Sequence, residues 1–174
     1  MLDAIRYLVA GGISWRAMPA DFPDWARVYA FFRRWRENGP VAEFHDRLRG
    51  RVREREGREA EPTAAIIDAQ SVPAAATVPA ASRGFDGGKL INGRKRHIVT
   101  GCLGLLLVVA VTADWAREKL ALAVEVVKRT DDTKGFVVLP RRWVVERPLG
   151  WLMHSRRLCR DYETLPATSE ALIQ

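Results

Sequence analysis

The stretch Ala64-Ala65-Ile66-Ile67-Asp68 decides the fold of this chain. Its apolar run predicts a buried strand, and the aspartate that closes the run carries a carboxylate to the exposed end of that strand. Much later, Arg141-Arg142-Trp143-Val144-Val145-Glu146-Arg147 predicts a basic helix that bears a glutamate. Two such carboxylates suit divalent-metal chemistry on a phosphate backbone when a third acidic ligand lies between them.

The composition points to a basic protein with a packed core. The 174 residues include 28 Lys and Arg against 21 Asp and Glu, which gives a net charge of +7, and 48% are hydrophobic. This balance favours a polyanionic partner, above all nucleic acid, over a basic protein whose charges only keep it dissolved. Cys102 and Cys159 lack metal-ligand spacing, which favours a reducing compartment. The apolar run at residues 103–113 is too short to span a bilayer and no secretory signal begins the chain, so we expect the cytoplasm and no membrane partner.

Residues 1–56 predict a helical N-terminal region. Apolar residues recur at helical spacing over residues 2–9, 28–35 and 41–52. Gly11-Gly12 and Asn38-Gly39-Pro40 end the first two helices, and Asp24 is suited to cap the second. Two interpretations stay open for this region: a helix-turn-helix-like DNA-binding unit, or a helical packing module whose arginines are solvated.

Residues 63–174 predict an α+β domain behind a linker at residues 57–62, where Gly57 and Pro62 interrupt a run of alternating charge. Strands are expected at 64–72, 94–99 and 105–112, and their short connections favour an antiparallel meander. A loop is expected at 73–83, a helix at 115–129 and a short strand at 135–139. A long basic helix from about Arg142 to Tyr162 completes the domain.

The chain resembles the insertion-sequence DDE transposases of the IS-five-like group, whose catalytic core is ribonuclease-H-like. The resemblance rests on an ordered set of motifs along nearly the whole chain: 12–16, 21–23, 29–35, 67–72, 93–97, 136–147, 156–158 and 162–163. It implies that residues 63–174 form a DDE domain of ribonuclease-H-like fold. It also implies that Asp68 and Glu146 match the catalytic carboxylates, which hold Mg²⁺ while DNA is cut and joined at insertion-element ends.

One element of the family pattern is missing, the second catalytic aspartate. Relatives carry it in an Asp-Gly-Gly-Tyr-like motif after a further strand, whereas here residues 111–113 run almost directly into 114–120. Asp114 is a poor replacement, because two intervening strand spacings would separate its backbone from that of Asp68 by about 10 Å. Asp86, Asp131 and Asp132 lie in expected loops and stay open as alternatives.

Two further departures concern the surroundings of the predicted site. Pro148 follows Glu146 by two residues, so Glu146 is expected either on a kinked or frayed turn or in a loop before a helix that begins at Pro148. Gly101 stands where relatives usually carry an aspartate, which is expected to loosen that corner.

These departures predict an internally deleted copy with an incomplete ribonuclease-H-like core, which is catalytically inactive. The alternative is a non-catalytic basic DNA-binding protein that occupies element ends or interferes with an intact transposase. The expected partners are DNA and either a second copy or an intact transposase. The expected DNA contacts are Arg33, Arg34, Lys89, Arg94, Lys95, Arg96, His97, Arg141, Arg142 and Arg147.

Overall fold

The computed structural model describes residues 1–113 and 143–174, and these form the α+β fold that the sequence predicts. The principal elements in chain order are α1 (Leu2–Gly11), α2 (Trp25–Asn38), α3 (Pro40–Arg55), β1 (Ala65–Pro73), β2 (Gly84–Asp86), β3 (Ile91–Gly101), β4 (Leu106–Thr112), α4 (Trp143–Met153) and α5 (Pro166–Ile173). Three short 3-10 turns accompany them: η1 (Trp15–Ala17), η2 (Ala80–Ser82) and η3 (Arg156–Leu158). The helix expected at 115–129 and the strand expected at 135–139 lie outside the described residues.

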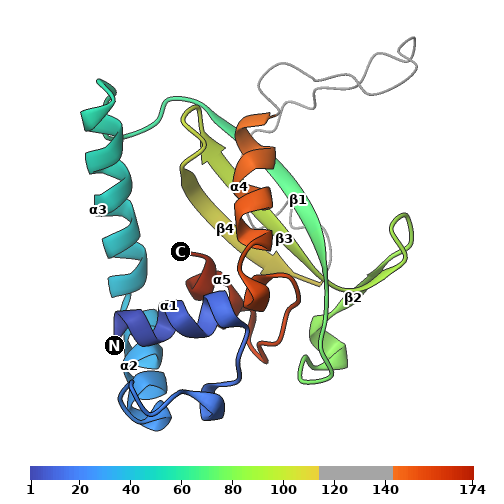
Figure 1. Ribbon diagram of the computed structural model, residues 1–174. Coiled ribbons are helices and arrows are strands. Elements are labelled where there is room, and N and C mark those ends of the chain that lie inside the picture. The colour runs from blue at the N-terminus through green and yellow to red at the C-terminus, as the bar shows by residue number, and fades with distance from the viewer. Residues whose placement is uncertain (114–142) are drawn as a thin grey trace.

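The sheet is antiparallel throughout and is built around β3. Strands β1, β2 and β4 all pair with β3, so β3 separates β1 from β4 (Figure 1). The three expected strands are confirmed, and the short strand β2 adds a hairpin that the sequence did not predict. Among the described strands, none pairs with the outer edge of β1. Only beyond its end does Ala74 bridge to Asp161.

Gly93 of β3 lies very close to the backbone of β1. A Cβ atom at this position would lie 1.9 Å from the carbonyl oxygen of Val72 in β1. No side chain fits at that distance, so the crossing of β1 and β3 at this point requires glycine.

Helices α4 and α5 cover one face of the sheet (Figure 1). Val145 of α4 packs with Ile98 and Val109 in a buried cluster, and Ile66 and Leu149 lie against it. Residues paired across antiparallel strands point to the same face, and Ile98 pairs with Val109. This cluster therefore marks the sheet face that α4 covers.

The N-terminal helices form as predicted. Gly12, with φ of 69°, ends α1 in the left-handed conformation, and the Asp24 carboxylate accepts a hydrogen bond from the amide of Ala26 (2.9 Å) to cap α2. The second core cluster joins Phe32 of α2 to Leu158 and Leu172. The N-terminal region therefore packs directly on the C-terminal segment.

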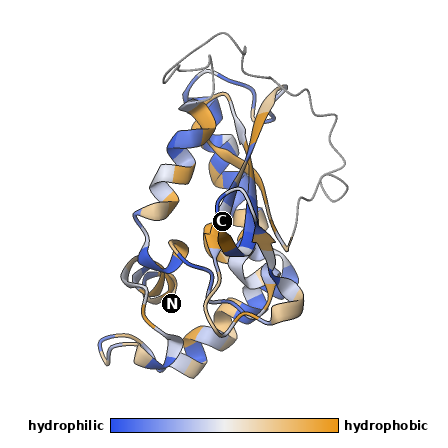
Figure 2. Cartoon of the chain, turned by 90° about the vertical axis from the view of Figure 1, so that its right-hand side faces the viewer, coloured by the Kyte–Doolittle hydropathy of each residue, from blue (hydrophilic) through white to orange (hydrophobic). Residues whose placement is uncertain are grey.

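Helix α3 has the predicted apolar face, but the described chain leaves most of that face uncovered. Phe44, Leu48 and Val52 are 49%, 46% and 44% exposed. Hydrophobic and hydrophilic residues both occur along the helices, as the two colours in Figure 2 show. None of the helices within residues 1–113 and 143–174 is both long and apolar enough to cross a membrane.

The C-terminal segment differs from the long helix expected at 142–162. Helix α4 ends at Met153, whose carbonyl oxygen accepts a hydrogen bond from the Cys159 thiol (2.9 Å). The chain then turns through η3, and residues 161–164 lie beside β3, where Arg94 binds them. A continuous helix would carry these residues away from Arg94, so this buried contact outweighs the local helical pattern. Helix α5, which follows, was not predicted.

Candidate functional site

Asp68 lies in the middle of β1, on the sheet face that α4 covers. It pairs with Ile98, whose side chain belongs to the cluster beneath α4. Its carboxylate accepts a hydrogen bond from the amide of Ala69 at 2.8 Å and is half-buried. The expectation of a carboxylate at the very end of a strand is wrong in detail, because β1 continues to Pro73.

Glu146 lies on α4 and is exposed to solvent, next to the buried Val145 that anchors the helix to the sheet. Strand β1 and helix α4 are in contact. The fold therefore brings both predicted carboxylates to the same side of the sheet, on two elements that pack together.

Pro148 sits inside α4, which contradicts the alternative that the helix begins there. Proline has no N–H, so the carbonyl oxygen of Val144, four residues earlier, receives no helical hydrogen bond from position 148. That oxygen faces the turn between β3 and β4, where a Cβ atom on Gly104 would lie only 3.2 Å away. The buried Pro148 ring and the missing side chain at Gly104 thus let α4 lie close to the sheet.

A complete metal site is absent from the residues that the structure describes. They contain no group of three or more His, Cys, Asp or Glu side chains that could hold a metal ion. Two catalytic ions lie about 3.5–4 Å apart and share carboxylate ligands, so Asp68 and Glu146 alone do not fit the two-Mg²⁺ arrangement that the resemblance implies. Three alternative ligands, Asp114, Asp131 and Asp132, lie outside the described residues.

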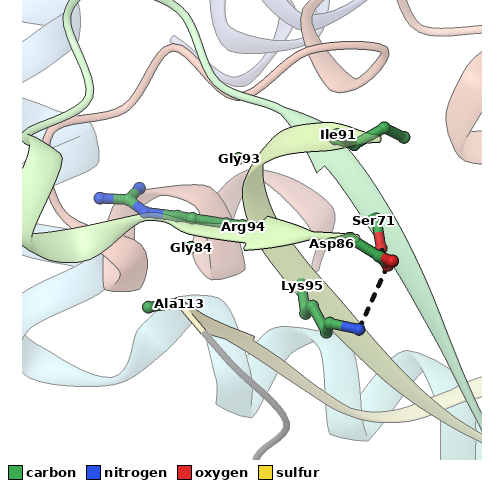
Figure 3. Close-up of a pocket in the computed structure, with 8 residues that line it drawn as sticks. All are labelled: Ser71, Gly84, Asp86, Ile91, Gly93, Arg94, Lys95 and Ala113. Atoms are coloured by element: carbon green, nitrogen blue, oxygen red, sulfur yellow. Dashed lines mark hydrogen bonds and ion pairs between the residues drawn. The ribbon is translucent and has the colours of Figure 1, made fainter. Parts of the chain in front are cut away.

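Asp86 is the remaining alternative, and its position rules it out as a partner of Asp68. Figure 3 shows its carboxylate between Ser71 and Lys95, while Arg94 points away from it. The Ser71 hydroxyl and the Lys95 ammonium (3.2 Å) both donate hydrogen bonds to it. Ser71 lies three residues beyond Asp68 on the same strand, so the two side chains point to opposite faces of the sheet.

Electrostatics agree with this assignment of Asp86. The hydrogen bond from Ser71, followed by that from Lys95, lowers the pKa of the Asp86 carboxyl to about 2. Asp86 also accepts hydrogen bonds from the amides of Gly88 and Lys89, both at 3.1 Å. The carboxylate stabilises the β2–β3 hairpin.

Three of the predicted DNA contacts on β3 are buried inside the protein. Arg94, Arg96 and His97 are 1%, 4% and 0% exposed. Arg94 donates to the Asp161 carboxylate (3.1 Å) and to the carbonyl oxygen of Glu163 (2.7 Å). The burial of these three side chains leaves them no surface for a DNA phosphate.

Arg96 and Arg157 extend this buried network. Arg96 donates to the carbonyl oxygen of Leu158 at 2.9 Å, and burial lowers the pKa of its guanidinium to about 10, so it stays charged at neutral pH. Arg157 donates to the Glu163 carboxylate at 2.8 Å. Burial raises the pKa of Glu163, while Arg157 opposes that rise. Arg96 thus holds the C-terminal segment against β3, while Arg157 joins η3 to Glu163 within that segment.

The other predicted DNA contacts fall into three groups. Arg33, Arg34, Lys89 and Arg147 are exposed, and Lys95 is half-buried and pairs with Asp86. Arg141 and Arg142 lie outside the described residues. Of the predicted DNA contacts within the described residues, the four exposed cations therefore remain accessible to DNA.

The outer face of α4 carries a feature that the sequence analysis missed. Trp143 and Trp151 are 49% and 56% exposed, and the guanidinium of Arg147 lies over both indole rings, 4.6 Å and 5.5 Å from their centroids. Trp143, Arg147 and Trp151 follow one another at intervals of four residues, and residues at this spacing share one face of a helix. This spacing was the signal available in the sequence.

Comparisons with known proteins agree with this geometry. Residues 1–45 match a family model described as a putative transposase of the IS4/5 family, and residues 59–124 match that of the transposase DDE domain. The second match includes all four strands and Asp68. Searches of curated proteins and of solved structures found no match. The chain therefore belongs to the DDE transposases of insertion sequences, a family that acts on DNA in transposition.

Proposed function

We propose that this chain is an internally deleted transposase that binds DNA at insertion-element ends but does not cut or join it. The observation that carries the proposal is the incomplete carboxylate set. Asp68 and Glu146 share one side of the sheet, β3 separates β1 from β4, and Asp86 is held on the opposite face. We assign no Mg²⁺-dependent step to the chain.

Strand cleavage tests the inactivity directly. The full chain is incubated with Mg²⁺ and DNA fragments that carry the terminal inverted repeats flanking its gene, beside an intact sister transposase as the positive control. We expect no cleavage by this chain. Robust cleavage that disappears in Asp68→Ala would refute the proposal, because it would require a third ligand that we do not assign.

DNA binding is expected to persist through the exposed cations. Each neutralised phosphate releases counterions, so the logarithm of the binding constant falls with that of the salt concentration by about 0.9 per contact. Arg33 and Arg34 are adjacent and exposed on α2. The double variant Arg33→Gln/Arg34→Gln is expected to reduce the salt slope by roughly 2, whereas Arg58→Gln, at an exposed position in the linker, leaves it unchanged.

A second candidate function is interference with an intact transposase. Three exposed apolar residues on α3, Phe44, Leu48 and Val52, favour it because such a face suits an oligomer contact. Added chain is then expected to reduce cleavage by an intact transposase through shared ends or mixed oligomers. If cleavage by the intact transposase stays unchanged at a saturating concentration of this chain, that result would count against this candidate alone.

The two free cysteines, Cys102 and Cys159, are consistent with the expected cytoplasmic location.

A further inference from the structure

The hairpin between β2 and β3 carries a strained residue at its tip. Leu90 has a φ of 54°, and among the described residues it is the one non-glycine with a positive φ. It is the last of the four loop residues 87–90, which join the paired residues Asp86 and Ile91. A leucine in this left-handed conformation is strained, because its Cβ atom crowds the neighbouring backbone.

Leu90 and Phe85 are also the two most exposed large apolar side chains of residues 1–113 and 143–174, at 77% and 64%. Since the protein covers so little of Leu90, packing within the chain does not offset the strain of its backbone. Strain of this kind is typical of residues whose side chains have a function. We call Leu90 and Phe85 the apolar tip, and Figure 1 shows their hairpin projecting from the sheet on the side away from α3.

Asp86 holds the hairpin in a fixed shape. Its carboxylate accepts hydrogen bonds from the Ser71 hydroxyl, from Nζ of Lys95 (3.2 Å) and from the amides of Gly88 and Lys89 (both 3.1 Å). A side chain on such a fixed loop loses little conformational freedom when it binds a partner. The same four bonds engage the carboxylate of the hairpin, because residues 84–93 contain no other Asp or Glu.

The charge around the apolar tip indicates the kind of partner. Lys89, directly before Leu90, is exposed, and Arg83, directly before β2, is partly exposed. The hairpin therefore presents cations beside its apolar side chains, while its carboxylate is engaged within the protein. This combination complements a polyanion with an apolar interior, which is the character of a DNA duplex.

The small size of the apolar tip also favours DNA over a protein partner. Specific protein interfaces engage about 20–30 residues on each side, whereas this hairpin presents two apolar side chains and one lysine at its end. Proteins that bend DNA through the minor groove need no more than this. One or two apolar side chains enter between neighbouring base pairs, part them and kink the duplex.

We propose that the apolar tip is a wedge, in which Leu90, with Phe85 beside it, enters the minor groove of duplex DNA and bends the duplex. The proposal rests on the proposed DNA-binding function and deepens it by adding a deformation of the bound DNA. Glycine at position 90 would relieve the strain but would leave no wedge. Insertion is expected at TpA steps, because pyrimidine–purine steps are the most easily unstacked.

Leu90→Gly is the informative variant, because its effects on stability and on DNA bending differ in sign. Glycine adopts the left-handed conformation freely and few contacts are lost, so the melting temperature should rise by about 1–4 °C. Leu165→Gly is the matched control. Leu165 is 52% exposed and has a φ of −102°, so the same exchange relieves no strain there and should not raise the melting temperature. Leu90→Met keeps an apolar wedge and should bend DNA like the parent.

Energy transfer between dyes at the two ends of a duplex of about 20 base pairs with a central TpA step measures bending by the full chain. We expect the parent to increase the transfer on binding, and Leu90→Gly to lose most of that increase and to bind roughly 5- to 10-fold more weakly. The dependence of binding on salt should stay unchanged in Leu90→Gly, which removes no charge, whereas Lys89→Gln should lower its slope by about 0.9. Leu165→Gly should match the parent in bending and affinity.

The wedge is refuted, and DNA binding remains, if the parent binds the duplex without bending it or if Leu90→Gly bends it like the parent. A lower melting temperature of Leu90→Gly would show that the leucine serves the fold. A reduced salt slope in Leu90→Gly would mean that phosphate contacts, and no wedge, were lost. If Leu90→Gly changes only the sedimentation coefficient, the tip is a protein contact. A parent that binds no DNA would refute the proposed function as well.

Discussion

Replacing Arg94 by methionine should destabilise the protein strongly without involving DNA. Its guanidinium makes five hydrogen bonds, to the Asp161 carboxylate, to both the carbonyl and hydroxyl oxygens of Ser82, and to the carbonyl oxygens of Glu163 and Thr164. These use all five N–H donors of an arginine. Methionine preserves the apolar stem but leaves a buried carboxylate without its cation.

The magnitude follows from that uncompensated charge. The side chains of Arg94 and Asp161 are 1% and 4% exposed, and removal of one partner from a buried pair costs about 3–5 kcal/mol. A protein of this size loses about 2–4 °C of melting temperature per kcal/mol, so Arg94→Met should melt roughly 6–20 °C lower. Asp161→Asn in the same background removes the stranded charge. The asparagine oxygen can still accept the bond that Asp161 accepts from the hydroxyl of Ser169 (2.7 Å), so the double variant should be more stable than Arg94→Met.

Urea unfolding followed by circular dichroism measures the free energies of unfolding, with Lys89→Met as the control at an exposed cation that the sequence analysis assigned to DNA as well. The control should change stability by less than about 0.5 kcal/mol. The reasoning is refuted if Arg94→Met loses less than about 1 kcal/mol, or if it retains its stability and loses DNA affinity instead. Either result would mean that the guanidinium is not committed to the C-terminal segment.

Three further predictions concern the sheet, a buried arginine and pH. Gly93→Ala should lower the melting temperature by more than about 10 °C, because a Cβ atom at position 93 has no space. Gly87→Ala is the control, since a Cβ atom at position 87 would have no other atom within 4 Å. Equal melting temperatures for the two variants would contradict this prediction. Gly101→Asp should raise the free energy of unfolding by about 1–2 kcal/mol in urea titrations. A Cβ atom at position 101 would lie 3.5 Å from Nη1 of Arg53, a buried atom that has no hydrogen-bond partner. Gly101→Ala, which lacks a carboxylate, should not reproduce the gain. Burial lowers the pKa of His45, so the unfolded chain binds the proton more readily and stability falls as pH decreases below about 6.5. His45→Gln should reduce the difference between the free energies of unfolding measured in urea at pH 7.5 and pH 5.5. An unchanged difference would show that His45 does not cause this pH dependence.

Local patterns along the sequence were sufficient for α1, α2, α3, β1, β3 and β4 and for the ancestry, but not for β2, α5 or the end of α4. Short apolar stretches between turn residues predicted β1, β3 and β4, and the caps at Gly12 and Asp24 set helix boundaries because they depend on neighbouring backbone groups alone. Whether Glu146 lies on a helix or in the loop before it stayed open, because Pro148 allowed both, and the structure places Glu146 inside α4. The spacing of residues along the chain does not show which carboxylates share a face of the sheet, because that arrangement depends on the register between strands.

The sequence by itself determined the α+β class, the basic character and the membership in the DDE transposases, since these follow from composition and short motifs. Only the tertiary structure decided the roles of the basic residues. Arg94 meets Asp161, 67 residues later in the chain, and so becomes an internal anchor rather than a DNA contact. Trp143 and Trp151 remain exposed because α4 turns Val145 toward the sheet instead. Burial is set by segments distant in sequence that cover a side chain, and no local pattern contains that information.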